Sequence, residues 1–237
     1  MFNLQYDASR LAKETYRGLA ASKARIEIQV SEFPPSRAGS LPLIADDLAL
    51  DFANTESGRG YPSHQDHLRN PSDIADWLRH TTTITLDEAQ WLRAETRARP
   101  DFAEDLLSQA IQLRSAIQDI GSAVGHGASP PEPALTILAT LHARFLARAS
   151  LAPDGESCQW RWGLRASPVE AALGPIALAA VKLFTECDFI RIRECGGSAC
   201  GWLFYDTSKN NSRKWCEMEV CGNRAKQRRL KTRRRAV

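Results

Sequence analysis

The sequence predicts an α+β protein, in which a mostly helical body with a few strands precedes a small cysteine-rich module. Apolar residues recur at helical spacing through the middle of the chain, and several of these segments follow a proline or a capping residue. Four of the six cysteines stand in two pairs near the carboxyl-terminal end, just ahead of a run of Lys and Arg. These observations separate a body with its own core from a module too short to build one.

The length of 237 residues suits one sizeable domain plus a small module, since domains commonly hold about 100–200 residues. We expect an N-terminal extension at 1–42, the body at 43–187 and the cysteine-rich module at 188–237. No run approaches the roughly 18 apolar residues that cross a bilayer, and the first residues lack the pattern of a secretory signal. These features predict a cytoplasmic protein without a membrane partner, where clustered cysteines favour a metal over disulfides.

The first segments carry few structural signals. Prolines and a glycine interrupt the extension near residues 34–39, which leaves open whether it is peripheral structure or disordered chain. The apolar segment 43–55 is expected to enter the body as a helix or a strand, and 56–68 is expected to be a polar loop.

Helices follow, each with a local start signal. Asn70 is a good N-cap, and Pro71 fits the first helical position because its missing N–H would be unpaired there. Thr85 begins a capping-box pattern, and Pro100 starts a longer amphipathic segment. A further helix is expected after the proline-rich linker 130–133.

The second half of the body mixes strand and helix signals. Residues 158–164 alternate like a strand, and 167–170 combine a capping-box pattern with a proline start. The helix behind them should kink or restart at Gly174 and Pro175. A strand at 189–192 is then expected to lead into the cysteine-rich module.

The cysteine pairs are Cys195 with Cys200 and Cys216 with Cys221, each with four residues between its members. Zinc takes four thiolates in tetrahedral structural sites, and cysteine pairs of this close spacing are usual there. We therefore predict one Zn²⁺ per chain; the alternative is four free cysteines. Asparagines at 210–211 suit a turn between the pairs. A helix that starts at the second pair would give a layout resembling a treble clef.

The net charge of +3 is unevenly distributed. Residues 191–237 hold 13 Lys/Arg and 4 Asp/Glu, whereas the remainder holds 18 and 24. A basic arm on an acidic body predicts a polyanionic partner. Charge alone does not separate DNA from RNA or from acidic lipid.

A helix behind the last cysteine would align side chains able to reach base edges in the major groove. These are Asn223, Arg224, Gln227, Arg228 and Lys231. Lys226 and Arg229 would face phosphates. For Asn223 and Arg224 a structural role beside the cysteine remains an equal alternative, and a solvated, non-specific tail is the alternative for the last residues.

Four residues of the body are candidates for a ligand pocket: Asp51, Asn54, Trp160 and Trp162. For Asp51 and Asn54, a structural role in helix capping and core packing is the favoured alternative. No nucleophile motif or Gly-rich phosphate loop accompanies the acidic residues, so catalysis is not predicted.

Segment 215–226, with its run Cys221-Gly222-Asn223-Arg224, is similar to the CGNR zinc finger, and 200–208 resembles the first knuckle and strand of that finger. In that family the finger follows a domain called ABATE, whose opening resembles 50–55 and whose last helix resembles 174–177. The resemblance spans roughly 43–229.

This resemblance implies a bacterial stress-induced transcription regulator that binds DNA. It also implies a body that senses a small-molecule effector or mediates homodimerisation. Two alternatives remain: an RNA-binding zinc protein, and an enzymatic or ligand-binding body with a purely structural finger.

Overall fold

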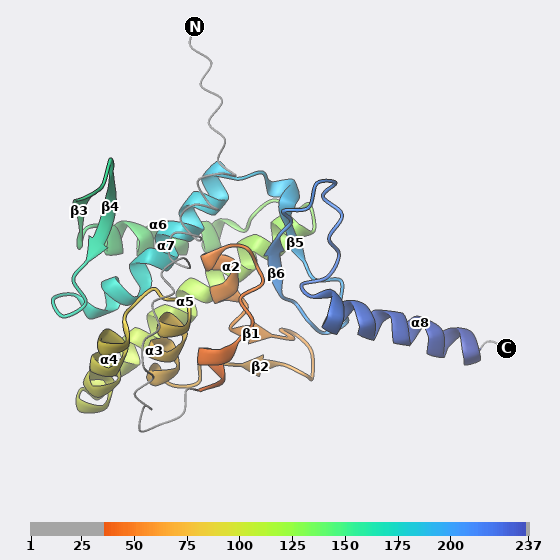
Figure 1. Cartoon of the computed structure of the whole chain (residues 1–237), viewed down its shortest axis with the longest axis horizontal. Coiled ribbons are helices and arrows are strands. Elements are labelled where there is room, and N and C mark those ends of the chain that lie inside the picture. The colour runs from red at the N-terminus through yellow and green to blue at the C-terminus, as the bar shows by residue number, and fades with distance from the viewer. Residues whose placement is uncertain (1–35, 236–237) are drawn as a thin grey trace, which may run out of the picture.

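The computed structural model describes residues 36–235, in which helices pack around a long central helix, three short strand pairs accompany them, and one helix leaves the body (Figure 1). The body contains η1 (Arg37–Ser40), α2 (Leu48–Ala53), β1 (Glu56–Ser57), β2 (Gln65–Asp66), α3 (Pro71–His80), α4 (Leu86–Ala98), α5 (Pro100–Gly125), α6 (Glu132–Leu146), β3 (Ala149–Asp154), β4 (Ser157–Trp162) and α7 (Pro168–Glu186). The carboxyl-terminal part contains η2 (Phe189–Arg191), β5 (Ile192–Glu194), β6 (Leu203–Tyr205), η3 (Met218–Gly222) and α8 (Asn223–Arg235). The predicted fold class is confirmed.

The core is organised around α5, which packs against α2, α3, α4, α6 and α7. Its buried stripe follows the period of one helix face, and it includes Leu106, Ala110, Leu113, Ile117 and Ile120. At about 1.5 Å per residue this helix is roughly 39 Å long. It also contacts β5 and β6, so the same helix carries the core of the body and supports the cysteine-rich module.

Two predicted helix starts are confirmed in detail. At the start of α3, the Asn70 side chain accepts hydrogen bonds from the N–H groups of Ser72 and Asp73, and Asp73 accepts from the N–H of Asn70. Thr85 and Glu88 make the same reciprocal pair at the start of α4. Such caps join residues three apart, so the local sequence is enough to specify them.

Helix α7 departs from two expectations. The predicted capping box at Ser167 is wrong, because no side-chain hydrogen bond caps the helix there. The restart expected at Gly174 and Pro175 as the alternative to a kink does not occur, since α7 is one uninterrupted element. A proline removes one backbone hydrogen bond, but α7 packs against α2 and α6, and Gly174 is buried against the indole of Trp162. This packing holds the helix together across the proline.

Within residues 36–235, α7 is the helix whose length and apolar composition would be sufficient to cross a membrane. Half of that stretch is buried inside the protein. Its buried side chains, such as Leu173, Ile176 and Leu183, belong to the common core.

The strands are more numerous than the sequence predicts. The expected strand at 158–164 is confirmed as β4, and it pairs antiparallel with the unpredicted β3. The expected loop 56–68 contains the small antiparallel pair β1–β2. The expected strand at 189–192 is η2 for its first part, because Asp188 accepts a hydrogen bond from the N–H of Ile190 and closes a turn. The differences therefore come from hairpin pairings and from one local turn.

Part of the expected N-terminal extension packs on the body. Ala38 and Leu41 are buried in the core, and the N–H of Ser36 donates to Asp76 at 2.7 Å. The imidazole of His80 hydrogen bonds to the carbonyl of Leu41. The body therefore starts before residue 43, because its buried contacts extend to the first residues that the structure describes. The rest of the expected extension, residues 1–35, lies outside the described residues.

Candidate metal centre and nucleic-acid interface

The first cysteine pair lies in the connection of the antiparallel β5–β6 hairpin. Cys195 directly follows β5, and its N–H donates to the carbonyl of Trp202 at 2.8 Å. Ala199 and Gly201 on either side of Cys200 have φ angles of 59° and 70°. This left-handed backbone turns the chain so that both sulfur atoms lie on the same side.

The second pair lies where the chain enters its last helix. Cys216 precedes η3, and Cys221 is inside η3, which continues directly into α8. Between the two pairs Asn211 has a φ of 47°, as expected for an asparagine in a tight turn. Because Cys221 is part of the first helical turn, the cluster fixes where α8 begins.

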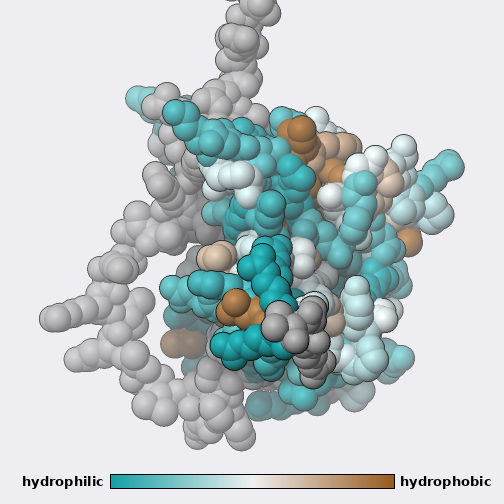
Figure 2. Space-filling view, turned by 90° about the vertical axis from the view of Figure 1, so that its right-hand side faces the viewer, coloured by the Kyte–Doolittle hydropathy of each residue, from teal (hydrophilic) through white to brown (hydrophobic). Residues whose placement is uncertain are grey.

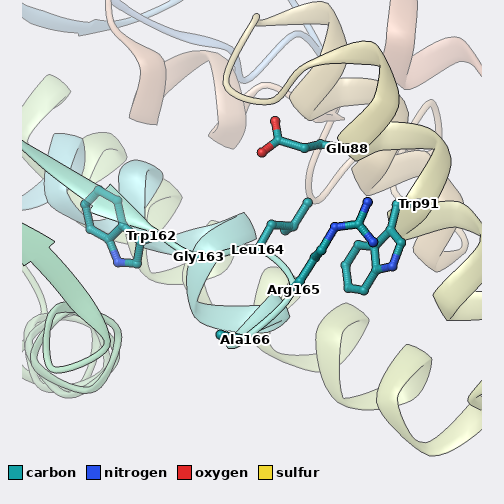
Figure 3. Close-up of a pocket in the computed structure, with 7 residues that line it drawn as sticks. All are labelled: Glu88, Trp91, Trp162, Gly163, Leu164, Arg165 and Ala166. Atoms are coloured by element: carbon teal, nitrogen blue, oxygen red, sulfur yellow. The ribbon is translucent and has the colours of Figure 1, made fainter.

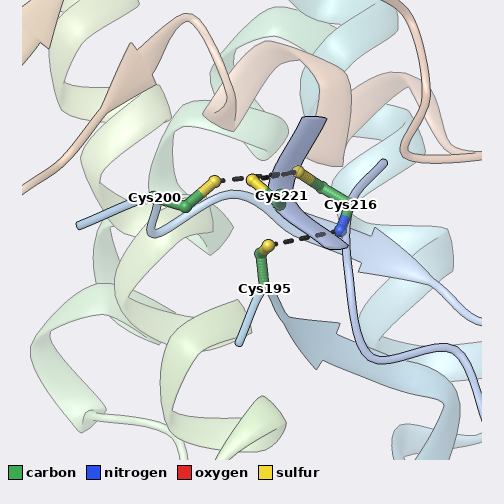
Figure 4. Close-up of side chains that lie close together, drawn as sticks. All are labelled: Cys195, Cys200, Cys216 and Cys221. Carbon is green, nitrogen blue, oxygen red and sulfur yellow. Dashed lines mark hydrogen bonds between the residues drawn. The ribbon is translucent and has the colours of Figure 1, made fainter. Parts of the chain in front are cut away.

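The four sulfur atoms converge from these two segments (Figure 4). All of them lie within 4.8 Å of one another, with 3.7 Å between Cys200 and Cys216 and 3.6 Å between Cys216 and Cys221. A zinc ion with Zn–S bonds of about 2.3 Å in a tetrahedral site requires sulfur atoms about 3.8 Å apart. A Cβ added at Gly197 would lie 3.0 Å from the sulfur of Cys221, so glycine suits the edge of the cluster. The arrangement fits one Zn²⁺ per chain.

The electrostatics of the cluster also favour a bound cation. Backbone N–H groups of Gly197 and Cys216 donate to the sulfur of Cys195. Hydrogen bonds from the Cys200 and Cys216 side chains, with these N–H groups, lower the pKa of Cys195 to about 2. Hydrogen bonding with Cys195 and Cys200 raises the pKa of Cys216. Four adjacent thiols cannot all ionise unaided, whereas Zn²⁺ displaces their protons and stabilises the thiolates.

A buried carboxylate organises the loop between the cysteine pairs. Asp206 is fully buried and accepts hydrogen bonds from the N–H groups of Ser208 and Arg213, both at 2.8 Å. Burial alone would raise the pKa of Asp206, but the hydrogen bonds from Ser208 and Arg213 lower it. This carboxylate therefore fixes the start of the segment that carries the second cysteine pair.

Arg213 connects that segment to the body. Its guanidinium donates to the carbonyls of Ile44 and Cys216, pairs with Asp46 at 3.0 Å, and lies over the ring of Phe204 at 4.3 Å. No sequence pattern marks this arginine, because its partners Ile44 and Asp46 are distant in the chain and it lies in a polar loop beside Lys214. It is a supporting residue of the metal centre that only the structure identifies.

The hairpin is built into the core of the body. The carbonyl of Gly201 accepts a hydrogen bond from Gln118 on α5, and the carbonyl of Cys200 accepts one from the N–H of Gly58. Leu203 is fully buried, and a Cβ added at Gly121 of α5 would lie 2.4 Å from its side chain. The cysteine-rich module and the helical body therefore share one hydrophobic core.

The candidate pocket residues of the body are not brought together. Asp51 is buried and accepts hydrogen bonds from the N–H groups of Ile44 and Ala45, while Asn54 is bonded to β6. Trp160 lies on the exposed β3–β4 hairpin, and Trp162 lines a pocket that none of the other three lines. Because the backbone occupies both polar side chains, these four residues do not form the predicted site.

Helix α8 extends away from the body (Figure 1). It carries eight Lys/Arg and no acidic residue, and Figure 2, which faces this end of the molecule, shows hydrophilic side chains over the helix. All seven predicted nucleic-acid contacts are exposed: Asn223, Arg224, Lys226, Gln227, Arg228, Arg229 and Lys231. Asn223 also donates to the carbonyl of Glu219 at 2.9 Å, which is the structural role left open for it.

Comparison with known proteins gives two family matches. The model of the CGNR zinc finger matches residues 191–234. The ABATE model, described as "putative stress-induced transcription regulator", matches residues 46–186. No curated protein gives a significant match. Neither matched family is described as an enzyme. The chain therefore belongs to the ABATE family, and its ABATE domain is followed by a CGNR zinc finger that binds one zinc ion.

Proposed function

We propose that this protein is a zinc-dependent, DNA-binding transcription regulator whose finger contacts DNA through α8. The observation that carries the proposal is a cationic helix without acidic residues that extends from the zinc cluster. DNA carries about one negative charge per 1.7 Å of its axis, so clustered Lys and Arg bind it by releasing counterions. The matched ABATE family supports the role in transcription.

The dimensions of α8 suit the major groove. Its 13 residues extend roughly 20 Å, and the groove is about 12 Å wide and admits an α-helix. Arg224, Gln227, Arg228 and Lys231 fall on one side of the helix, while Lys226 and Arg229 point toward the other side. In our proposal the first set contacts base edges and the second set contacts phosphates.

The body supplies the second half of the proposed function. It senses a small-molecule effector or mediates homodimerisation, and the protein acts in the cytoplasm. A second copy would double the DNA contact surface, since one short helix covers little of a duplex. The rigid attachment of the finger to α5 supports this division, because a change in the body would be transmitted to the helix.

The decisive experiment is selection of genomic DNA fragments by the purified, zinc-loaded full chain near physiological salt. We expect a recurrent motif. Changing Gln227 and Arg228 to Ala should relax that motif, because base contacts carry sequence information. Changing Lys226 and Arg229 to Ala should instead weaken binding to all DNA sequences equally. It should also reduce the slope of log affinity against log salt concentration by about 2.

Two controls define the failure of the proposal. A Cys216→Ser/Cys221→Ser variant removes half of the zinc ligands and should lose the motif; its folding is checked by circular dichroism. Competition with structured RNA at matched salt tests the alternative partner. Enrichment without a motif, equal in all variants, would reduce the activity to non-specific polyanion binding, and preference for RNA would replace DNA as the target.

A further inference from the structure

A pocket of about 350 Å³ lies on the body between α4 and the segment that joins β4 to α7. Its walls are Glu88, Trp91, Trp162, Gly163, Leu164, Arg165 and Ala166 (Figure 3). Two indoles and a leucine give it a mainly apolar lining, and one arginine supplies a positive charge. Ligand pockets have volumes of roughly 300–1,000 Å³ and commonly combine such walls with a few polar groups, so this pocket has room for a small molecule.

The aromatic walls of this pocket are held in place. The indole N–H of Trp162 donates to the carbonyl of Phe145 at 3.2 Å, and the same ring lies directly against Gly174 of α7. Trp91 is partly buried on α4, and the guanidinium of Arg165 lies 5.4 Å from its ring centre. A cation over an indole face is attracted by the ring quadrupole, so the charge is held beside the apolar walls.

Arg165 forms no salt bridge or hydrogen bond with any residue in the described part of the chain, 36–235. The one acidic residue of the pocket, Glu88, is occupied elsewhere: its carboxylate accepts hydrogen bonds from the N–H and the hydroxyl of Thr85. The five N–H donors of the guanidinium are therefore available to a ligand. A planar carboxylate matches the geometry of that group through two parallel hydrogen bonds.

We propose that this pocket binds a small aromatic carboxylate, whose ring packs against the apolar walls at Trp91 and Leu164 and whose carboxylate pairs with Arg165. The ring matches the apolar lining, and the anionic group matches Arg165, the cationic residue among those that line the pocket. The inference deepens the effector-sensing part of the proposed function and rests on that part only. It is independent of whether α8 binds DNA.

The test is calorimetric titration of the full, zinc-loaded chain, without DNA, with benzoate, benzyl alcohol and acetate as probes. Benzoate should bind with a Kd near or below about 1 mM. Benzyl alcohol lacks the charge and acetate lacks the ring, so each should bind at least about tenfold more weakly. The indole N–H resonance of Trp91 in NMR spectra should shift with benzoate, which places the ligand in this pocket.

Surface variants make the test specific without altering the core. Arg165→Gln should weaken benzoate at least about tenfold, whereas Arg161→Gln, an exposed arginine on β4 outside the pocket, should not change it. Glu88→Gln keeps a hydrogen-bond acceptor for Thr85 and removes a negative charge that repels the carboxylate of the ligand, so benzoate should bind more tightly. Equal affinity of Arg165→Gln and Arg161→Gln, or equal binding of benzoate and benzyl alcohol, would overturn the proposal. Absence of benzoate binding at millimolar concentration would overturn it as well.

Discussion

The side chain of Asn54 exchanges two hydrogen bonds with the backbone of Leu203, 149 residues further along the chain. Its amide nitrogen donates to the carbonyl at 2.8 Å, and its amide oxygen accepts from the N–H at 2.8 Å. One side chain thus takes the place of a neighbouring strand at the free edge of β6. Both residues are almost completely buried, so water cannot replace either bond.

We expect Asn54→Ala to destabilise the whole protein by about 2–4 kcal/mol, because it leaves a buried donor and a buried acceptor on Leu203 unpaired. Asn54→Asp should be at least as severe, since a carboxylate cannot donate to the Leu203 carbonyl. Chemical denaturation followed by tryptophan fluorescence measures both. The control is Asn210→Ala, in an exposed turn, and a loss for Asn54→Ala no greater than for this control would contradict the coupling.

Removal of zinc should destabilise the body as well as the finger. Cys195, Cys216 and Cys221 belong to the same hydrophobic core as α5. Zinc binding contributes directly to folding where the full set of four thiolates forms only on the metal. Treatment with a strong chelator is expected to lower the unfolding temperature of the entire chain by at least about 10 °C, in one transition. Calorimetry would refute the shared core if the body kept its transition and only a small second one disappeared.

Arg213 should be essential for the stability of the second cysteine segment. Arg213→Met removes its bonds to the carbonyls of Ile44 and Cys216 and its contact with Phe204, and we expect a loss of about 2–3 kcal/mol. Arg213→Lys keeps the charge but not the planar fork, so it should rescue less than half of that loss.

The control for Arg213 is its ion-pair partner Asp46, whose side chain is 46% exposed. Asp46→Asn should cost less than about 1 kcal/mol, because exposed pairs contribute little. Denaturation curves in urea provide both values. If Asp46→Asn were as destabilising as Arg213→Met, the ion pair rather than the carbonyl bonds would explain the role of the arginine.

Gly174 should tolerate no side chain. A Cβ there would lie 2.5 Å from the indole nitrogen of Trp162, whose ring is held by its hydrogen bond to Phe145. Gly174→Ala is therefore expected to cost about 1–3 kcal/mol despite the better helix propensity of alanine. It should also change the Trp162 fluorescence. Gly163→Ala, whose Cβ would lie 3.6 Å from the nearest atom outside its chain neighbours, is the matched control and should be nearly neutral.

The sequence alone determined those features that depend on residues close together in the chain. The caps at Asn70 and Thr85 join residues three positions apart, so the pattern contains the whole interaction. The zinc ligands were predictable because close cysteine spacing and thiolate chemistry together restrict the metal and its geometry. The cationic character of α8 follows directly from composition.

The tertiary structure decided everything that depends on distant partners. The sequence predicts Asn54 as a pocket residue, but its side chain hydrogen bonds to β6. Trp162 lines a pocket with Trp91 and Arg165 rather than with Asp51, Asn54 or Trp160. Pro175 remains inside a helix because α2 and α6 pack against that helix, which no local signal reveals. The physical reason is the same in each case: a buried polar group or an apolar wall takes its partner from whatever the fold brings beside it.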